Sequence, residues 1–470
     1  MIIMKKSILK GLLLILFSCT CFACTNGIEN LVDDAGTPIV DSPAGLIDDI
    51  KASSNLLGWG NIGDTTIRVK ADKDILPAQP TKKADLSAIT ITGNSNFRLL
   101  SVGGSLSAGF KDGGLYREGQ LTAFPNLIAR QMSVAFTQPL FEVNEGNGSG
   151  YKTLVGTEPI ATFKLVKNNL GYTDAKATKF KKFNGDKNDQ YAFPEITKRL
   201  DLTKFDQKYV ERLIGSNTKT NFKTPLEWVG SQSADFAIFE FGTDDLVRSI
   251  LYGGGGGINS FFGGAAYFST EFGLMKKMAD NKTKGVILNA PDVLDFPYFN
   301  QFTTEKVKKL GVKLKVQESS SSEFYRNFDF STDRLVPTAK TEKLFLTSKA
   351  GDIIELSDGD VLSAESSDNE FASVVNTFYN INEVLPRAKE LNWPIVDLYG
   401  IYKRIMTNTY VTGDGVKVNP DWKTGNFFSV DGIYPTAFGQ AVITNEVIKT
   451  INQHYKMSIP LVDTRFFLKK

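Results

Sequence analysis

Histidine is almost absent from this chain, whose 470 residues include only one, His454. The three cysteines all lie near the N-terminus, at Cys19, Cys21 and Cys24, and the rest of the chain has none. The remainder therefore cannot form a disulfide or a thiolate metal site, and a single imidazole excludes most zinc patterns. We expect neither a metal nor a cofactor.

Long apolar runs are also missing beyond the N-terminus. There, three lysines accompany an apolar stretch that ends near Phe17 and is too short to span a bilayer, which is the pattern of a secretory signal. The cysteines that follow resemble those of bacterial lipoprotein signals. The resemblance implies lipidation of Cys24, which precedes a polar tether, or of Cys19, which better fits the usual tetrad. An ordinary secretory signal with incidental cysteines is the alternative.

The charge balance gives no sign of a nucleic-acid partner. The formal net charge is +2, and removal of the signal takes away three lysines and no acidic residue, which leaves about −1. A near-neutral body lacks the basic surface that nucleic acids attract. We expect the membrane to be reached through a lipid anchor, at the cell outer membrane.

The chain divides into three parts by composition. We interpret residues 1–23 as the signal peptide, 24–95 as a flexible tether and N-terminal extension, and 96–470 as one α/β domain. Within this domain, polar and lysine-rich composition marks insertions near 144–230 and 300–360. These insertions are the expected surfaces for a partner.

Strand and helix patterns alternate along the domain, which predicts a parallel sheet covered by helices on both faces. Short apolar runs predict strands at 97–102, 236–241, 285–289 and 394–398, and periodic patterns predict helices at 124–132, 272–280, 370–391 and 437–455. Ligands of such folds bind beyond the carboxyl ends of the strands. Ser105 follows the first predicted strand and Asp244 follows the second, so both should lie at that edge.

Three motifs occur in a fixed order: Gly103-Gly104-Ser105-Leu106, Gly242-Thr243-Asp244-Asp245 and Asp431-Gly432-Ile433-Tyr434-Pro435. They resemble the first, third and fifth blocks of the SGNH (GDSL) hydrolases. With Asp112-Gly113-Gly114-Leu115-Tyr116, they resemble the GDSL lipoproteins of Bacteroidetes type. This resemblance implies a three-layer αβα, flavodoxin-like sheet with insertions.

The resemblance also implies roles for individual residues. Ser105 matches the nucleophile and Asp431 matches the acid that orients a histidine. Gly148 is the candidate for the oxyanion glycine of the second block, and Asp244 stands where the family has an oxyanion asparagine. Tyr434 stands at the expected histidine position.

Two departures from the family pattern weaken the expected chemistry. A tyrosine has a pKa of about 10, so only about one phenol in a thousand is ionised at neutral pH, and a neutral phenol is a poor general base. An ionised Asp244 would repel an oxyanion, and loss of one donor costs roughly 3 kcal/mol. His454 lies about 20 residues beyond Tyr434 on the last predicted helix, on the order of 30 Å away, so we expect it at the surface.

Purely structural roles are possible for the same residues. Ser105 and Asp431 are both candidates for helix caps, Asp244 for closing its own loop, and Tyr434 for packing at a pocket rim or stacking on a ligand. A direct contact between Asp431 and Ser105 is a further possibility.

We therefore expect a lipoprotein with a degenerate catalytic set that serves as a binding or assembly subunit. Its partner could be an outer-membrane β-barrel complex, and its ligand an acyl chain or a glycan. The alternative is an active serine ester hydrolase, either lipase-like or a carbohydrate deacetylase.

Overall fold

The computed structural model of the chain describes residues 60–63, 66–68, 72–91, 93, 96–156, 158–166, 170–174, 176–185, 187–194, 208–213, 222, 224–251, 269–318, 322–362 and 374–468. The chain divides into two units, Met1–Val40 and Asp41–Lys470, and every described residue belongs to the second. The predicted signal peptide, both candidate lipidation cysteines and the tether up to residue 59 lie outside the described residues.

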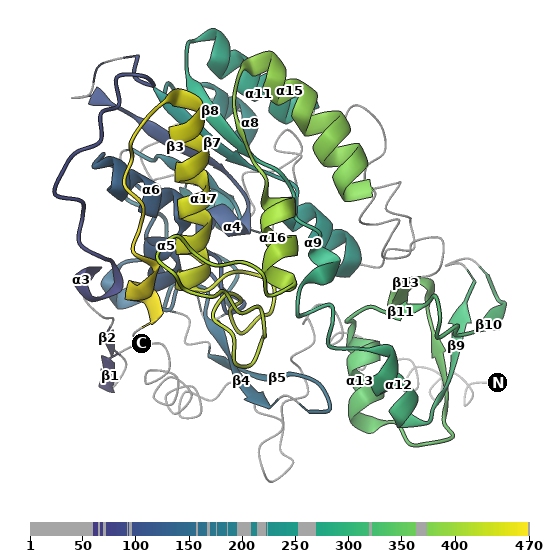
Figure 1. Ribbon diagram of the computed structural model, residues 1–470. Coiled ribbons are helices and arrows are strands. Elements are labelled where there is room, and N and C mark those ends of the chain that lie inside the picture. Colours follow the sequence, from purple (N-terminus) through teal and green to yellow (C-terminus); the bar gives the residue numbers. More distant parts are fainter. Residues whose placement is uncertain are drawn as a thin grey trace, which may run out of the picture. The chain divides into compact units, whose positions relative to one another are not determined.

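An α/β architecture is built on a central five-stranded sheet whose strands are all parallel (Figure 1). The strand order is β14 (Ile395–Val396), β8 (Lys284–Leu288), β7 (Phe236–Glu240), β3 (Leu99–Gly103) and β6 (Gln190–Ala192). Every residue of β3 and β7 is buried, as expected for strands with helices on both faces. All four predicted core strands are present. The fifth, β6, lies within 144–230, so that segment is not wholly an insertion.

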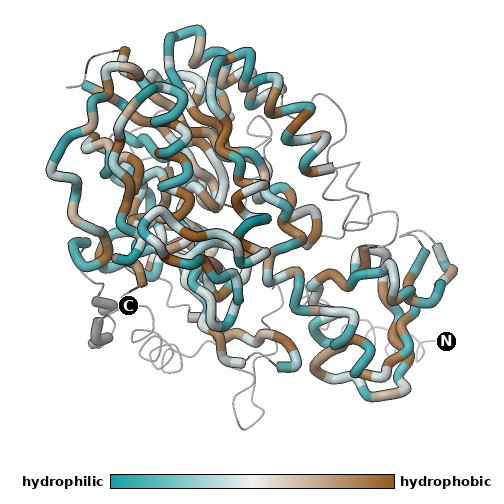
Figure 2. The backbone as a smooth tube through the Cα atoms, viewed as in Figure 1, coloured by the Kyte–Doolittle hydropathy of each residue, from teal (hydrophilic) through white to brown (hydrophobic). Residues whose placement is uncertain are grey.

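Helices flank the sheet in two groups. One contains α5 (Arg117–Thr122), α6 (Phe124–Met132) and α17 (Ala437–Tyr455); the other contains α8 (Pro225–Gly230), α11 (Ser269–Asp280) and α15 (Leu385–Leu391). Thr436 caps α17 by accepting a hydrogen bond from the amide of Gly439, and Lys456 ends that helix in the left-handed conformation. The hydrophobic stretches of the tube in Figure 2 follow the central strands and the helix sides that pack on them.

Shorter elements connect this core. The helices are α3 (Asp72–Ile75), α4 (Ser105–Ala108), α7 (Lys208–Leu213), α9 (Thr243–Leu251) and α16 (Leu398–Met406), and a π-helix, η7 (Val374–Val384), runs directly into α15. The 3-10 turns are η2 (Val143–Glu145), η4 (Val293–Asp295), η5 (Asp358–Asp360) and η8 (Thr464–Leu468). Two hairpins pair β1 (Gly60–Gly63) with β2 (Thr66–Arg68), and β4 (Tyr151–Gly156) with β5 (Thr162–Val166).

The N-terminal extension is not flexible throughout. Ile75, Leu86 and Ile89 are buried in the main hydrophobic core. The amide of Ile91 also donates to the carboxylate of Asp235, just before β7. Residues 72–91 therefore belong to the folded domain, because their apolar side chains complete its core.

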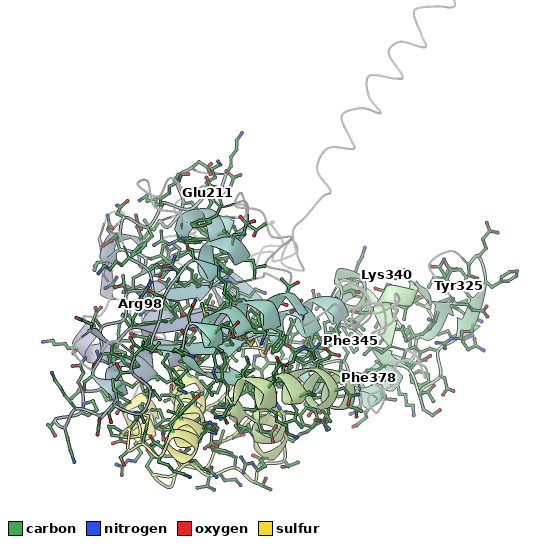
Figure 3. The ribbon with its side chains drawn as sticks, turned by 90° about the horizontal axis from the view of Figure 1, so that it is seen from above. Arg98, Glu211, Tyr325, Lys340, Phe345 and Phe378 are labelled. Atoms are coloured by element: carbon green, nitrogen blue, oxygen red, sulfur yellow. The ribbon has the colours of Figure 1, made fainter. Side chains whose placement is uncertain are left out.

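Residues 304–362 form a small layered insertion with a hydrophobic cluster of its own. Its sheet has the order β10 (Tyr325–Asn327), β9 (Lys313–Gln317) and β12 (Ile353–Leu356) and packs beside α12 (Thr304–Leu310) and α13 (Ala339–Thr347). A two-stranded ribbon joins β11 (Arg334–Leu335) to β13 (Val361–Leu362). Tyr325, on the edge strand β10, projects outward from this insertion (Figure 3).

Candidate functional site

Ser105 is the first residue of α4 and stands directly after β3, at the carboxyl edge of the sheet. The N-cap of α4 is Gly104, and no side chain caps this helix, so the interpretation of Ser105 as a capping residue is wrong. A Cβ atom at Gly104 would lie 2.7 Å from Oδ2 of Asp244. The glycine at this position therefore lets the carboxylate of Asp244 approach the chain.

The hydroxyl and the amide of Ser105 both donate to one atom, Oδ2 of Asp244. The two distances are 2.7 Å from Oγ and 2.8 Å from N. Asp244 lies at the start of α9, directly after β7, so neighbouring parallel strands deliver the two residues to the same edge. The amide that would be an oxyanion donor in a serine hydrolase is thus held by a carboxylate.

Tyr434 completes this arrangement from the other end of the chain. Its phenol donates to Oδ1 of Asp244 at 2.7 Å, and its ring meets that of Phe110 edge-on at 5.3 Å. Ser105 is 1% exposed, Asp244 7% and Tyr434 8%. Tyr434 is therefore a buried hydrogen-bond donor, and the expectation of a rim residue is wrong.

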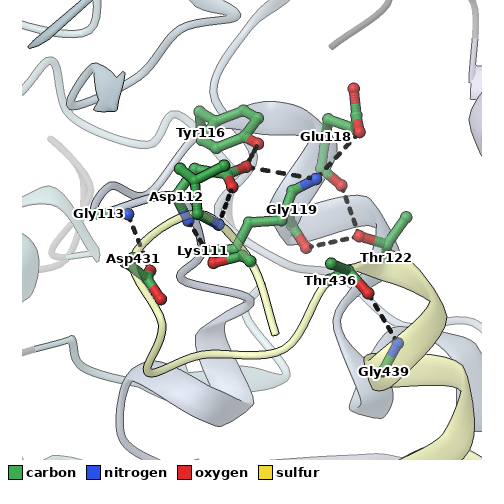
Figure 4. Close-up of polar contacts among 12 residues, drawn as sticks. Lys111, Asp112, Gly113, Tyr116, Glu118, Gly119, Thr122, Asp431, Thr436 and Gly439 are labelled. Carbon is green, nitrogen blue, oxygen red and sulfur yellow. Dashed lines mark hydrogen bonds and ion pairs between the residues drawn. The ribbon is translucent and has the colours of Figure 1, made fainter. Parts of the chain in front are cut away.

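The carboxylate oxygens of Asp431 accept hydrogen bonds from backbone amides. Its Oδ1 accepts from the amides of Ile433 and Tyr434 at 2.8 and 2.9 Å. Its Oδ2 accepts from the amide of Gly113 at 2.9 Å, the contact drawn in Figure 4. The carboxylate closes its own turn and joins it to the loop at Gly113. It does not cap the last helix, since that cap is Thr436.

Burial sets the ionisation of the central carboxyl. Burial and the nearby Glu240 raise the pKa of Asp244 to about 7, against the opposing effect of the hydrogen bonds from Tyr434 and Ser105. Burial raises the pKa of Glu240 as well. The pKa of Tyr434 is raised well above its usual value, first by burial and then by Asp244. Its phenol therefore stays neutral and donates.

Glu240 is a site residue that the sequence interpretation missed. Its Oε2 accepts from the amide of Gly104 at 3.1 Å and from the hydroxyl of Ser107 at 3.0 Å, which holds the loop after β3 from the neighbouring strand. The sequence feature that could have identified Glu240 is its position as an acidic residue inside the apolar run from Phe236 to Phe241. A buried carboxylate within a core strand needs such partners.

Gly148 does not present a free amide. Its N–H donates to the carbonyl of Glu145 at 2.8 Å, within the turn that follows η2. A Cβ atom there would lie 2.2 Å from the carbonyl oxygen of Leu115, so glycine is required for close packing. The neighbouring Asn147 is fully buried, and its side-chain amide has no hydrogen-bond partner among the described residues.

His454 lies in the last turn of α17 and is exposed, as expected. Its Nε2 is 3.1 Å from the carbonyl oxygen of Asn392. The side chains gathered at the carboxyl edge therefore include a serine, a tyrosine and carboxylates, and the one imidazole of the described residues lies elsewhere. The nearest acceptor for the proton of Ser105 is the carboxylate of Asp244.

Comparison with known proteins gives no assignment. No family model matches the chain, and no curated protein matches it. Among the described residues, no group of three or more acidic, histidine or cysteine side chains could hold a metal ion. In that same part of the chain, no helix combines the length and apolarity required for crossing a membrane.

Proposed function

We propose that this chain is an SGNH-like, flavodoxin-like outer-membrane lipoprotein that does not turn over substrate and serves as a binding or assembly subunit. One observation carries the proposal: the hydroxyl and amide of Ser105 and the phenol of Tyr434 all donate to Asp244. A serine so held, with a neutral phenol in place of an imidazole, lacks the imidazole base and the free oxyanion donor on which the acyl transfer of that family depends.

The surface proposed for the partner is the insertion at 304–362. The insertion at 304–362 presents exposed apolar side chains, among them Phe324 at 74% and Ile353 at 64% exposure. Such side chains are candidates for contact with a membrane β-barrel complex. The lipid anchor at Cys24 or Cys19 rests on the sequence motif. Metabolic labelling with palmitate, compared between Cys24→Ser and Cys19→Ser, tests the anchor and its position.

The catalytic part of the proposal is tested by hydrolysis of p-nitrophenyl acetate and butyrate. Wild type and Ser105→Ala should release nitrophenol at the same low rate. Activity well above background that disappears in Ser105→Ala would contradict the proposal. A normal melting temperature for both proteins is the control for folding.

A second candidate, a working ester hydrolase, is favoured by one feature of the same site. Asp244 has a pKa raised to about 7 and accepts directly from Oγ of Ser105, so it meets the requirement for a general base in reach and in pKa. Its substrates would be acyl lipids or acetylated glycans. Covalent labelling of Ser105 by a fluorophosphonate, lost in Asp244→Asn, is its distinguishing result.

A further inference from the structure

The β4–β5 hairpin extends from the core, and its tip packs against the insertion (Figure 1). Ile160, at its tip, is buried in the hydrophobic cluster of the insertion. Glu158 faces two lysines: Lys306 of α12 at 3.6 Å and Lys423 of the loop before α17 at 3.0 Å. Three segments distant in sequence therefore meet around this hairpin.

Aromatic rings line this meeting point. The ring of Phe163, on β5, lies 5.7 Å from that of Trp422, and Tyr298 meets Trp422 at 6.3 Å. Lys152, on β4, places its Nζ 5.4 Å from the Phe163 ring centre. Its side chain lies over Gly113, whose amide binds Asp431. Lys152 is thus adjacent to the loop at Gly113 that Asp431 holds.

Three polar groups here have no partner in the described part of the chain. These are Nζ of Lys152, the hydroxyl of Tyr298 and the carboxylate of Glu342 on α13. All three residues are half-buried, none makes a side-chain hydrogen bond or ion pair with another described residue, and none of the three groups is fully buried. We call Lys152, Phe163, Tyr298, Glu342 and Trp422 the Lys152 cluster. Because these polar groups reach the surface and are not engaged within the described part of the chain, they are free to bind a ligand.

The same groups influence each other's ionisation. Burial raises the pKa of Glu342 to about 7, opposed by the charge of Lys152. Burial lowers the pKa of Lys152, opposed by Asp431 and Glu342. The pKa of Tyr298 is raised by burial and then by Glu342 and Asp431. The geometry that joins Lys152 and Tyr298 is the chain of ring contacts from Phe163 to Trp422.

The composition of the Lys152 cluster excludes two ligand classes. An acyl chain would bury Lys152 and Glu342 without any hydrogen bond, which is unfavourable. A phosphate or carboxylate ligand would meet the charges of Glu342 and Asp431 as well as that of Lys152. A neutral saccharide satisfies all three groups, because its hydroxyls donate to a carboxylate and accept from an ammonium and a phenol. Its apolar C–H groups can contact the aromatic rings.

We propose that the Lys152 cluster is a binding site for a neutral oligosaccharide. The inference deepens the proposed function, on which it rests for the view that a ligand is held rather than hydrolysed. The site is formed by residues of both the hairpin and the insertion. Lys152 comes from one, Glu342 from the other, and Tyr298 from the loop between β8 and α12.

Isothermal titration with the full chain tests the proposal. The probes are the neutral hexasaccharides of cellulose, mannan, xylan and laminarin, with hexagalacturonate as the charged comparison. We expect at least one neutral hexasaccharide to bind, and hexagalacturonate to bind more weakly. Lys152→Met and Glu342→Gln should each weaken binding about tenfold or more. The control variants Lys343→Met and Glu355→Gln alter exposed side chains of the same insertion and should bind as wild type does.

Failure to bind any neutral hexasaccharide at 10 mM (roughly the weak limit for a specific site) would overturn the inference, as would binding that both cluster variants retain. Stronger binding of hexagalacturonate would assign the site to acidic ligands instead and would also overturn it. Ester hydrolysis is measured separately, with the p-nitrophenyl esters. If the chain binds a saccharide and also shows Ser105-dependent hydrolysis, only the proposed function is rejected. If it neither binds a saccharide nor hydrolyses an ester, only the inference is rejected.

Discussion

The phenol of Tyr434 donates to Oδ1 of Asp244 at 2.7 Å, across 190 residues of sequence. The other oxygen of the same carboxylate holds Ser105. Asp244 therefore joins the loop after β3 to the turn before α17. Ser105, Asp244 and Tyr434 are thus partners in one buried hydrogen-bond network, and this network can be tested by substitution.

Removal of the Tyr434 hydroxyl should destabilise the protein. Tyr434→Phe keeps the contact with Phe110 but leaves the Asp244 carboxylate with one donor fewer, which costs about 1–3 kcal/mol in the free energy of unfolding. Urea denaturation at pH 7.5 measures the effect. Tyr399→Phe is the control, because no hydrogen bond of the Tyr399 hydroxyl to another described residue exists. Equal stability of the two variants would contradict the expected role of the phenol.

Asp244 should give the protein a pH-dependent stability. Its pKa is about 7 in the folded chain and about 3.9 in an unfolded one. Because the folded value is the higher, the contribution of this carboxyl to stability is complete below about pH 4 and is lost as the pH rises through 7. Asparagine does not titrate. The stability of Asp244→Asn relative to wild type should therefore rise from pH 4 to pH 7, by up to about 4 kcal/mol.

Asp414→Asn is the matched control for this pH series. Burial alone would raise the pKa of Asp414, but hydrogen bonds from Thr412 and Thr464 lower it to about 2. A folded pKa below the unfolded one gives stability that is lost only as the pH falls through that range. Between pH 5 and pH 7 the difference between Asp414→Asn and wild type should stay constant. A flat difference for Asp244→Asn as well would show that Asp244 does not titrate in this range.

The combined substitution Tyr434→His with Asp244→Asn should raise ester hydrolysis. The phenol of Tyr434 and the hydroxyl of Ser105 reach opposite oxygens of one carboxylate, so position 434 lies within side-chain reach of the serine. An imidazole there supplies a base, and an asparagine supplies an oxyanion donor. We expect at least about a tenfold increase in p-nitrophenyl butyrate hydrolysis, abolished by adding Ser105→Ala. No increase in a folded double variant would contradict this expectation.

Ile160 should determine how firmly the hairpin holds the insertion. It is 2% exposed within the cluster of the insertion, and Ile160→Ala should cost about 2–4 kcal/mol for the lost packing. Hydrogen exchange should accelerate in α12 and α13, where that cluster lies. Ile353→Ala, at a position that is 64% exposed, removes the same atoms and should leave the exchange unchanged. Indistinguishable exchange in the two variants would argue against docking through Ile160.

Much of the fold follows from local sequence patterns. The strands β3, β7, β8 and β14 and the helices α6, α11 and α17 match apolar runs and periodicities that are visible without any coordinates. Strand β6 was missed, because its three residues, Gln190–Ala192, carry no such signal and form a strand only through pairing with β3. The packing of residues 72–91 was missed for the same reason, since it depends on contacts with residues far along the chain.

The candidate site was only partly predictable. The position of Ser105 and Asp244 at one sheet edge follows from the ends of parallel strands. The role of Asp244 as a shared acceptor does not, because it depends on the conformations of three side chains and on the close approach at Gly104. The occupied amide of Gly148 likewise depends on a turn whose geometry no sequence motif specifies.

The shared acceptor has a consequence for any attempt to place a histidine beside Ser105. A histidine at position 434 would remove the phenol that now donates to one oxygen of the buried Asp244 carboxyl, while the carboxyl itself would remain. The single change should therefore cost folding free energy before it offers any turnover. An asparagine at position 244 would have to come first, so placing an imidazole base beside Ser105 without this loss takes two substitutions.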